Sequence, residues 1–414
     1  MRRMRKKPFQ LLLLTVFAVF ASLTGRAQNQ AAVLVLVPAN LIDGISPEAI
    51  HDATIVVRGS QIESMPRGAG PLPAGAQVLD IKGRWLLPGF VDAHAHLFTM
   101  ASTRRALQYG TTTVRVMGVE HFVDVGMREL HNRGATDLPA VVAAGYQIRP
   151  DVSEAFPGFL LDFPNMSEFR TGLRGSDNLR KVVRALAEHH VDLIKILATE
   201  RAGTPETDPR KRTFSDEEMA AIVDEAHKAG LPVAAHAHSD EGVRGAVLAG
   251  VHSIEHGTYS SDDTLALMKS KGTYLDPTIS VWDEGTTSEN PILQQRTRAM
   301  QPRARDTAAG AWKMGVKIVA GTDTTYDKSG LGLGMADEIA ELVRAGMPPM
   351  EAIKAGTSGS AECLGVGKRT GAIKPGMTAD FIAVDRDPVA DIAALQDLVL
   401  VVHDGKVILN RLNP

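Results

Sequence analysis

The feature that most constrains this chain is an alternation of short apolar segments with helical patterns between residues 88 and 368. Such alternation is typical of parallel sheets, because a chain needs a crossover helix to return to a parallel strand. Eight strand–helix units in about 280 residues favour an α/β fold with a closed (β/α)8 barrel, a TIM barrel. A doubly wound open sheet is the alternative. The predicted strands are 90–96, 111–117, 139–144, 191–197, 232–238, 252–256, 273–279 and 316–322.

One helical segment carries signals for both of its ends. Ser215 can cap the first turn, and Glu218 completes a capping box three residues later. Gly230 is the residue type that commonly follows the end of a helix. We therefore predict a helix between Ser215 and Gly230.

Both ends of the chain show another pattern, in which short strands alternate with turn residues. Residues 398–409 contain Asp404-Gly405, which is a strong hairpin signal. We predict that residues 28–87 and 369–414 together form a small β-sandwich domain that flanks the barrel of residues 88–368.

The first 27 residues have the character of an export signal. A basic start precedes the apolar stretch 11–23, which has signal-peptide length and is short for a membrane span. Gly25 and Ala27 are small residues suited to cleavage after Ala27. We expect a periplasmic or secreted protein with no stable membrane span in the mature chain. An uncleaved amphipathic anchor is the alternative.

The charge and the cysteine content of the chain argue against a nucleic-acid partner and against stabilisation by a disulfide. The formal net charge of -3 provides no basic footprint for nucleic acid. Cys363 is the single cysteine, so no internal disulfide can form and the core must stabilise the fold. We expect Cys363 to be a packing residue.

Histidine and aspartate side chains stand where predicted strands end, and one lysine lies within a strand. His94 and His96 are two residues apart, so their side chains share a face of the first barrel strand. Because the carboxyl ends of barrel strands meet at one mouth, we expect all these side chains to converge there. Imidazole and carboxylate ligands suit borderline divalent metals. The predicted site residues are His94, His96, Lys195, His236, His256 and Asp323.

Lys195 lies in the middle of the apolar run 191–197, where a charged ammonium group is costly to bury. Burial lowers the pKa of a lysine, and the free amine can add carbon dioxide. The resulting carbamate is an anion that offers one oxygen to each of two metal ions, about 3.5–4 Å apart. We therefore predict a CO2-derived carbamate on Lys195. A salt bridge to a barrel carboxylate such as Asp323 is the alternative.

Six longer segments carry a more specific signal, and they span nearly the whole chain after the export signal. They are LLPGFVDAHAH, VDLIKILAT, EAHKAGLPVAAHAHSDEGVRGAVLAGVHSIEHG, VAGTD, PPMEAIKAGTSGSAECLGV and GAIKPGMTADFIAVDRDP. Together they resemble the amidohydrolase superfamily. They are most similar to its imidazolonepropionase-related branch, which includes Xaa-Pro dipeptidases and metal-dependent carboxypeptidases. The resemblance implies a hydrolase that assembles as a homo-oligomer.

The resemblance also implies roles for the clustered residues. The two histidines of the first barrel strand would bind one divalent ion together with Asp323, and His236 and His256 would bind a second. Carboxylated Lys195 and a water or hydroxide would bridge them. Nitrogen and oxygen ligands fit zinc, and Mn, Co and Ni are also compatible.

These roles predict hydrolysis of amide or peptide C–N bonds in dipeptides, N-acyl amino acids or related small amides. The bridging hydroxide would attack the carbonyl, and Asp323 would carry the proton to the leaving nitrogen. The same site could instead act on lactones, cyclic amides or organophosphate triesters. A non-catalytic periplasmic metal-binding protein is a further alternative.

Three more residues are candidate substrate contacts: His238, Tyr146 and Arg149. The loop 146–178 is too long for a plain connection, and long loops at a barrel mouth usually shape the active site. We expect the remaining histidines to be surface, helix or structural residues, with His121, His131, His227 and His403 at the surface or on helices.

Two loops depart from the pattern of the relatives. Relatives often carry Gly-Gly-His after the third barrel strand, where this chain has GYQIRPDVSEAF. They often carry a glycine pair after the lysine strand, where this chain has ATERAG at 198–203. Both loops shape the substrate pocket, so the resemblance supports the metal ligands more strongly than it supports dipeptidase specificity.

Overall fold

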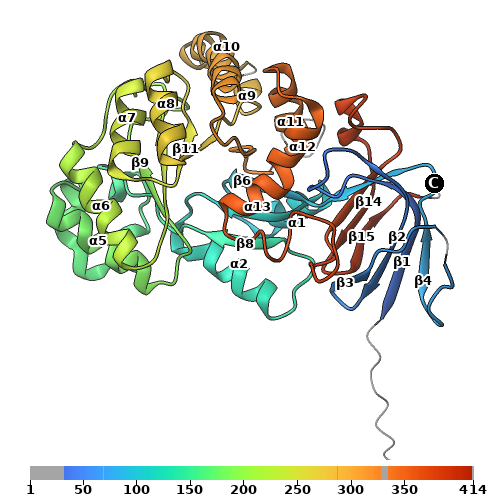
Figure 1. The fold of residues 1–414 in the computed structure, drawn as a ribbon. Coiled ribbons are helices and arrows are strands. Elements are labelled where there is room, and N and C mark those ends of the chain that lie inside the picture. Colours follow the sequence, from blue (N-terminus) through green and yellow to red (C-terminus); the bar gives the residue numbers. More distant parts are fainter. Residues whose placement is uncertain (1–31, 69, 287, 328–333, 413–414) are drawn as a thin grey trace, which may run out of the picture. The chain divides into compact units, whose positions relative to one another are not determined.

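The structure, a computed structural model, describes residues 32–68, 70–286, 288–327 and 334–412 (Figure 1). The chain from Val33 onward forms one compact unit. The export signal that we predict for residues 1–27 lies outside the described residues, so its cleavage and the localisation stay predictions.

Seven short parallel strands form the centre of this unit. They occur as a three-stranded sheet of order β6-β7-β8 and a four-stranded sheet of order β12-β11-β10-β9. Nearly all their side chains are buried, as the apolar runs in the sequence predicted. The strands are β6 (Phe90–Ala95), β7 (Thr111–Val116), β8 (Ala140–Ala143), β9 (Ile194–Leu197), β10 (Val233–Ala237), β11 (Ser253–His256) and β12 (Tyr274–Asp276).

Isolated parallel bridges join the two sheets to each other. On one side, Ile148 pairs with Ile196 of β9. On the other side, Ile318 pairs with β12 and Thr324 pairs with β6. This is the arrangement of a (β/α)8 barrel, and the predicted fold class is confirmed.

The segment 316–322, which we predicted as the eighth strand, is not a regular strand. Its backbone is shared among several neighbours: Leu275 donates to the Lys317 carbonyl at 2.8 Å, and Ala93 donates to the Ala320 carbonyl at 3.0 Å. Because each neighbouring strand makes only isolated bridges with it, no continuous ladder forms. The segment nevertheless runs between β12 and β6 and carries Asp323 to the barrel mouth.

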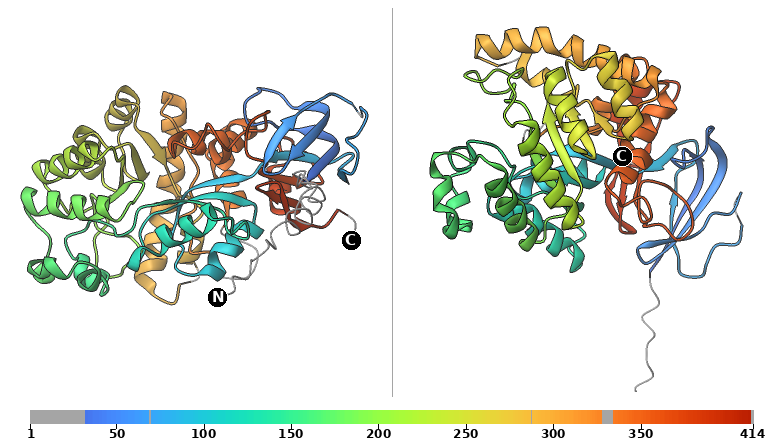
Figure 2. Two further views of the ribbon diagram at one scale, coloured as in Figure 1. Left: turned by 90° about the horizontal axis from the view of Figure 1, so that it is seen from below. Right: turned by 60° about the vertical axis from the view of Figure 1, so that its left-hand side comes forward.

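Helices follow the barrel strands and cover their outside (Figures 1 and 2). In α6 (Asp216–Lys228), Ser215 and Glu218 form the predicted capping box, and Gly230 follows the helix end with φ +73°. Within the described part of the chain, no helix is long and apolar enough to cross a bilayer. The other helices of the barrel are α1 (Met100–Gln108), α2 (Val123–Asn132), α5 (Ser176–Glu188), α7 (Asp240–Ala249), α8 (Asp262–Lys271), α9 (Trp282–Thr286), α10 (Pro291–Met314), α11 (Met335–Arg344), α12 (Pro349–Lys354) and α13 (Ser360–Cys363).

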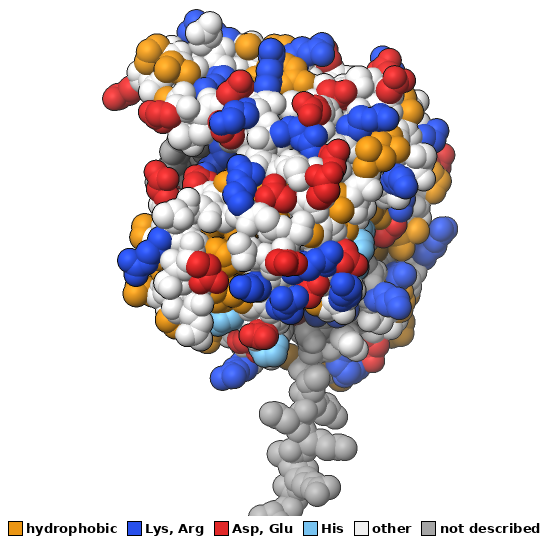
Figure 3. Space-filling view, turned by 90° about the vertical axis from the view of Figure 1, so that its left-hand side faces the viewer, with side chains coloured by type: hydrophobic (Ala, Val, Ile, Leu, Met, Phe, Trp, Pro, Cys, Tyr) orange, Lys and Arg blue, Asp and Glu red, His pale blue; other side chains and the backbone are white. Residues whose placement is uncertain are grey.

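The side of the molecule that carries α5 and α6 is drawn in Figure 3, where acidic and basic side chains are interspersed. Ion pairs link the two helices: Arg180 contacts Asp224, and Arg184 contacts Glu225 at 2.7 Å. Exposed pairs of this kind add little stability, but they leave neither sign of charge dominant over these helices.

Strands from both ends of the chain join in one eight-stranded sheet, of order β15-β14-β13-β5-β1-β2-β3 with β4 beside β1. It has its own apolar core. Asp404 and Gly405 have φ of 48° and 72°, as a type I′ turn requires, so the predicted hairpin is confirmed. The domain boundaries at residues 87 and 369 stay predictions. The strands are β1 (Val33–Leu41), β2 (Ile50–Arg58), β3 (Gln61–Ser64), β4 (Gln77–Asp80), β5 (Trp85–Pro88), β13 (Phe381–Val384), β14 (Leu398–His403) and β15 (Lys406–Asn410).

Candidate metal centre and active site

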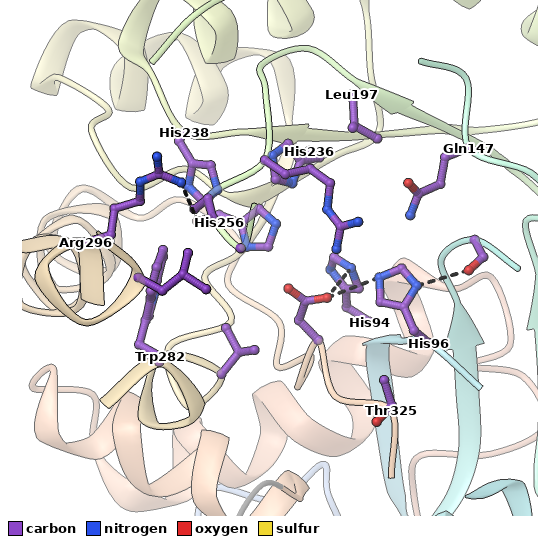
Figure 4. Close-up of a pocket in the computed structure, with 18 of the residues that line it drawn as sticks. His94, His96, Gln147, Leu197, His236, His238, His256, Trp282, Arg296 and Thr325 are labelled. Atoms are coloured by element: carbon purple, nitrogen blue, oxygen red, sulfur yellow. Dashed lines mark hydrogen bonds and ion pairs between the residues drawn. The ribbon is translucent and has the colours of Figure 1, made fainter. Parts of the chain in front are cut away.

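The six predicted site residues all line one pocket of about 570 Å³ at the carboxyl ends of the barrel strands. Figure 4 shows the imidazoles of His94 and His96 on one side of this pocket and those of His236 and His256 on the other. These residues come from strands of both central sheets, and the barrel arrangement of the two sheets brings them together. The predicted convergence of side chains is therefore present in the structure.

The side chains form two groups with metal-ligand spacing. In the first, the Nε2 atoms of His94 and His96 lie 3.3 and 3.2 Å from Oδ1 of Asp323. In the second, His236 and His256 are joined by His238, and one ligand atom of each lies within 4.8 Å of the others. Each group offers the imidazole or carboxylate donors that a divalent ion such as zinc prefers. Lys195 Nζ lies 3.4 Å from His94 Nε2.

Four of the pocket histidines use Nδ1 for a partner away from the metal-ligand atoms. Metal-binding histidines usually do this, because the outer hydrogen bond sets the tautomer and orients the ring. His236 differs, since its Nε2 lies 3.2 Å from the Glu200 carbonyl. The Nδ1 partners are the Glu255 carboxylate for His94 (3.1 Å), the Gly118 carbonyl for His96 (3.1 Å), the Thr258 hydroxyl for His238 (2.9 Å) and the Thr278 hydroxyl for His256 (2.6 Å).

Burial favours the neutral form of four of these imidazoles, those of His94, His236, His238 and His256, and the neutral imidazole is the form that binds metals. Burial lowers the pKa of His94 to about 4 and that of His238 to about 3. It also places the pKa of His236 and of His256 well below the ordinary value. Protons therefore compete weakly for these nitrogen atoms at neutral pH.

The two other site residues have shifted pKa values as well. Burial lowers the pKa of Lys195 to about 8, so an appreciable fraction of the amine is free near neutral pH. Burial alone would raise the pKa of Asp323, but the adjacent His94 and His96 hold it well below the ordinary value. Asp323 is therefore ionised and can act as a ligand or a base.

A buried ion pair lies beside the first histidine group. Glu255 is fully buried and accepts from Arg115 at 3.1 Å as well as contacting His94. Burial would raise the pKa of Glu255, but the charge of Arg115 lowers it overall, so the carboxylate can orient the His94 ring. Neither Glu255 nor Arg115 was among the residues predicted from the sequence.

Unusual backbone conformations gather at the pocket. Asp323, His256 and Thr278 have φ of 52°, 73° and 45°, in the left-handed region that residues other than glycine rarely adopt. Strained backbone of this kind concentrates at functional sites, where the surrounding structure holds it in place. Here the strained backbone orients the carboxylate of Asp323, the imidazole of His256 and the hydroxyl of Thr278, which lies 2.6 Å from that imidazole.

The three predicted substrate contacts have different positions. His238 lines the pocket, and its predicted contact with substrate stays a prediction. Tyr146 does not line the pocket, because it is fully buried and its hydroxyl donates to Asp162 of the loop at 2.5 Å. Arg149 is also outside the pocket lining, and one edge of its guanidinium donates to both carboxylate oxygens of Asp151 at 2.7 Å. The positions of Tyr146 and Arg149 favour a role in holding the loop, which contains α3 (Val152–Ala155) and α4 (Phe159–Asp162).

Several polar residues of the pocket were not predicted from the sequence, among them Gln147, Trp282 and Arg201. Gln147 Oε1 and Trp282 Nε1 are buried and have no hydrogen-bond partner among the described residues. Unpaired atoms of this kind are available to a ligand. Arg201 lines the same pocket, where the charges of Asp323 and Asp151 act on its guanidinium. Gln147 could have been found, because it follows the third barrel strand, whereas Trp282 follows no such rule.

Glu338 of α11 holds the turn that leads into the Trp282 wall of the pocket. It is fully buried, and its two carboxylate oxygens accept from the backbone of Ile279 at 2.9 Å and Ser280 at 2.7 Å. In Glu338→Gln an amide NH2 would face one of these donors. We expect a loss of about 1–3 kcal/mol in the free energy of unfolding, measured in urea. The exposed Glu154→Gln is the control, and equal stability of both variants would contradict this role.

The same variant also has a pH signature. Burial raises the pKa of Glu338 from 4.5 to about 7 in the folded protein. The unfolded chain therefore releases this proton first, and the protein loses stability as pH rises between these two values. We expect this part of the pH dependence to be absent in Glu338→Gln.

The chain is similar in sequence and in structure to known hydrolases. A family model described as "Amidohydrolase family" matches residues 85–408. Ochratoxinase from Aspergillus niger is 34% identical over 240 residues, which are 56% of this chain and 48%, or about half, of ochratoxinase. An imidazolonepropionase from Mesorhizobium japonicum is 25% identical over 379 residues, 83% of this chain and 87% of that one. The crystal structure of a Xaa-Pro dipeptidase with bound methionine in the active site superposes with a TM-score of 0.81 at 28% identity, over 91% of this chain and 99% of that one.

Proposed function

Because the chain belongs to the amidohydrolase family, we propose that it is a metal-dependent hydrolase that cleaves the C–N bond of small amides. Dipeptides and N-acyl amino acids are the proposed substrates. The observation that carries this proposal is the convergence of His94, His96, His236, His256, Lys195 and Asp323 in one pocket. The structural similarity to a Xaa-Pro dipeptidase supports a peptide-like substrate.

The residues present fit two divalent ions. His94, His96 and Asp323 would hold one, and His236 and His256 would hold the other, with His238 near enough to join them. When bound, such ions polarise a carbonyl and lower the pKa of water from 15.7 to about 7. Zinc suits the nitrogen and oxygen donors, and Mn, Co and Ni remain compatible.

Lys195 would link the two groups of ligands as a carbamate. Its free amine forms a bond to the carbon of CO2 and releases one proton, which leaves an anionic carbamate on the side chain. The lowered pKa of about 8 makes the free amine available for this step. The modification also removes an otherwise unpaired ammonium group from a fully buried position.

Asp323 would move the proton during hydrolysis. Its carboxylate is ionised in the pocket, so it can accept a proton from the attacking water and deliver it to the leaving nitrogen. The positive φ of Asp323 and its contacts with His94 and His96 hold the carboxylate in place for both steps.

The pocket lining supports a substrate with an apolar group and a carboxylate. Phe98, Phe156 and Leu293 supply apolar surface, and Arg201 supplies a cation. The loop that carries Arg201 is held by Arg296, whose guanidinium donates to four backbone carbonyls. The carbonyls are those of Ala202, Thr204, Pro205 and Thr207. A fixed loop presents the guanidinium of Arg201 in a form suited to a bidentate pair with carboxylate.

Arg201→Ala tests this part of the proposal. A hydrogen-bonded charge pair contributes about 1.5–3 kcal/mol, so we expect KM for N-acyl amino acids to rise by roughly 10–100-fold. The matching C-terminal amides, which lack the carboxylate, should be unaffected. Arg210→Ala is the matched control, because Arg210 lies on the same loop and stacks on Tyr259 outside the pocket. An equal rise in KM for the acids and for their amides would show that Arg201 does not recognise the substrate carboxylate.

A substrate screen tests the function as a whole. Metal-loaded protein is incubated with dipeptides, N-acyl amino acids, lactones and phosphotriesters, and each product is measured by chromatography. We expect release of free amino acid from the first two classes. Turnover of only lactones or phosphotriesters would assign the same pocket to the alternative chemistry, and no turnover with intact metal content would favour a metal-binding protein.

We also propose that the mature protein is exported and assembles as a homo-oligomer. Both proposals rest on the sequence, through the character of residues 1–27 and the family resemblance. Mass spectrometry of the protein recovered from the periplasm or medium should give a chain that begins at Gln28. Size-exclusion chromatography with light scattering should give a mass above that of one chain.

A further inference from the structure

A second cluster of metal-ligand residues lies where α2 meets the hairpin of β14 and β15. His131 is in the last turn of α2, His403 ends β14, and Asp404 begins the turn. The Nε2 atoms of the two histidines lie 3.1 Å apart. Asp404 Oδ2 lies 3.1 Å from His131 Nε2 and 3.8 Å from His403 Nε2. None of the three residues lines the catalytic pocket.

The burial of His403 differs from the sequence prediction. We expected a surface or helix residue, but the side chain belongs to a strand and is fully buried. The prediction was wrong because no local pattern shows that α2 covers this end of the sheet. His131 is partly buried, at 12% exposure of its side chain, and Asp404 is at 21%. Solvent therefore reaches the cluster from one side.

The spacing of the three ligand atoms matches a tetrahedral zinc site. Zn–N and Zn–O bonds of about 2.0–2.2 Å at tetrahedral angles separate neighbouring ligand atoms by roughly 3.4 Å. The three distances in this cluster, 3.1, 3.1 and 3.8 Å, lie around that value. In the catalytic pocket, the Nε2 atoms of His94 and His96 have the same kind of spacing from Asp323, 3.3 and 3.2 Å.

A carboxylate behind His403 completes the pattern. His403 Nδ1 lies 2.8 Å from Oδ1 of Asp380, which is itself buried and accepts from the hydroxyl of Thr370 at 2.9 Å. In the neutral ring, a proton that Nδ1 donates to this carboxylate leaves Nε2 without one, and Nε2 lies 3.1 Å from His131 Nε2 and 3.8 Å from Asp404 Oδ2. This carboxylate–histidine–metal relay is the usual support of a zinc-binding imidazole.

We propose that His131, His403 and Asp404 bind a structural zinc ion that fastens α2 to the hairpin of β14 and β15. Water or a nearby carbonyl would complete the coordination. The ion would connect a barrel helix to a sheet built from both ends of the chain, through residues 272 positions apart in the sequence. This site is independent of the proposed hydrolase function, because its residues take no part in the pocket.

The competing explanation is a hydrogen-bonded cluster without an ion. A proton would then have to lie between the two Nε2 atoms, and Asp404 would pair with whichever ring is charged. Both explanations predict that loss of His131 lowers Tm. Only the zinc site predicts a change in the metal content, so metal content is the deciding measurement.

The test compares three full-length variants with the wild type after expression with zinc. Zinc per chain is measured by plasma mass spectrometry, and Tm is measured with and without added zinc. His131→Ala removes one ligand. Asp404→Asn removes another but retains the turn, because Asn-Gly is also a favoured type I′ pair. His227→Ala is the matched control, since His227 occupies the last turn of α6 and is exposed.

We expect His131→Ala and Asp404→Asn to contain one zinc per chain less than the wild type and His227→Ala. Added zinc should raise the Tm of stripped wild-type protein more than that of either ligand variant, and hydrolysis by all variants should match the wild type. Equal zinc content in the wild type and both ligand variants would overturn the proposal. Because the result is a difference in zinc content, it holds whether the catalytic pocket binds two ions, one or none.

Discussion

Asp323→Asn is expected to lower kcat/KM for amide substrates by about 10²–10⁴-fold, the range that a general acid–base residue contributes. The amide cannot accept the proton from water or return it to the leaving nitrogen. Asparagine is the gentlest replacement, because it tolerates the left-handed backbone that Asp323 adopts at φ 52°. The measurement is steady-state hydrolysis by metal-loaded protein.

Two controls separate a lost proton carrier from a damaged site. Circular dichroism and Tm should show an intact fold, and metal analysis should show whether the ion beside His94 is retained. Asp327→Asn changes an exposed residue shortly after Asp323 and should keep full activity. Activity of Asp323→Asn close to that of the wild type would exclude Asp323 as the proton carrier.

Lys195→Met is expected to remove most activity, by at least about 100-fold, and to lower the metal content of the protein. Methionine fills a similar volume but cannot form the carbamate. Loss of a residue that only hydrogen-bonds to a metal ligand already lowers metal affinity or activity by about 10–100-fold. Loss of a ligand that bridges two ions should therefore lower them further. Stability should not fall, because an apolar side chain replaces an ionisable group at a fully buried position.

Carbon-13 labelling makes the Lys195 experiment specific. Wild-type protein equilibrated with labelled bicarbonate should give a carbamate signal in the carbon NMR spectrum, and Lys195→Met should not. Lys317→Met is the control, because Lys317 pairs with Glu362 at the surface and should not affect metal content. Full activity and full metal content in Lys195→Met would show that the lysine has no part in the site.

The barrel and the metal-ligand candidates were predictable for one physical reason. Parallel strands that are buried on both faces produce apolar runs, and the residue at the end of each run must face the common mouth. His94, His236 and His256 could therefore be placed without knowledge of any contact. Asp323 was placed in the same way, even though its segment is not a regular strand.

Side chains outside the strand ends could not be placed from the sequence. Arg149 was expected near the substrate, but Asp151 two residues later binds it and holds it away from the pocket. His403 was expected at the surface, and only its contacts with Asp380 and His131 reveal its environment. These positions depend on contacts between segments that no local pattern relates, as does the Arg296 contact that fixes the loop of Arg201.

The central claim is that two metal ions and a modified lysine occupy the barrel mouth. Anomalous diffraction from crystals of the purified full chain, collected on both sides of the zinc absorption edge, tests it most directly. The account predicts one peak between the imidazoles of His94 and His96, another between those of His236 and His256, and continuous density beyond Nζ of Lys195. An unmodified amine and a pocket without anomalous peaks, in protein that hydrolyses the substrate, would contradict it.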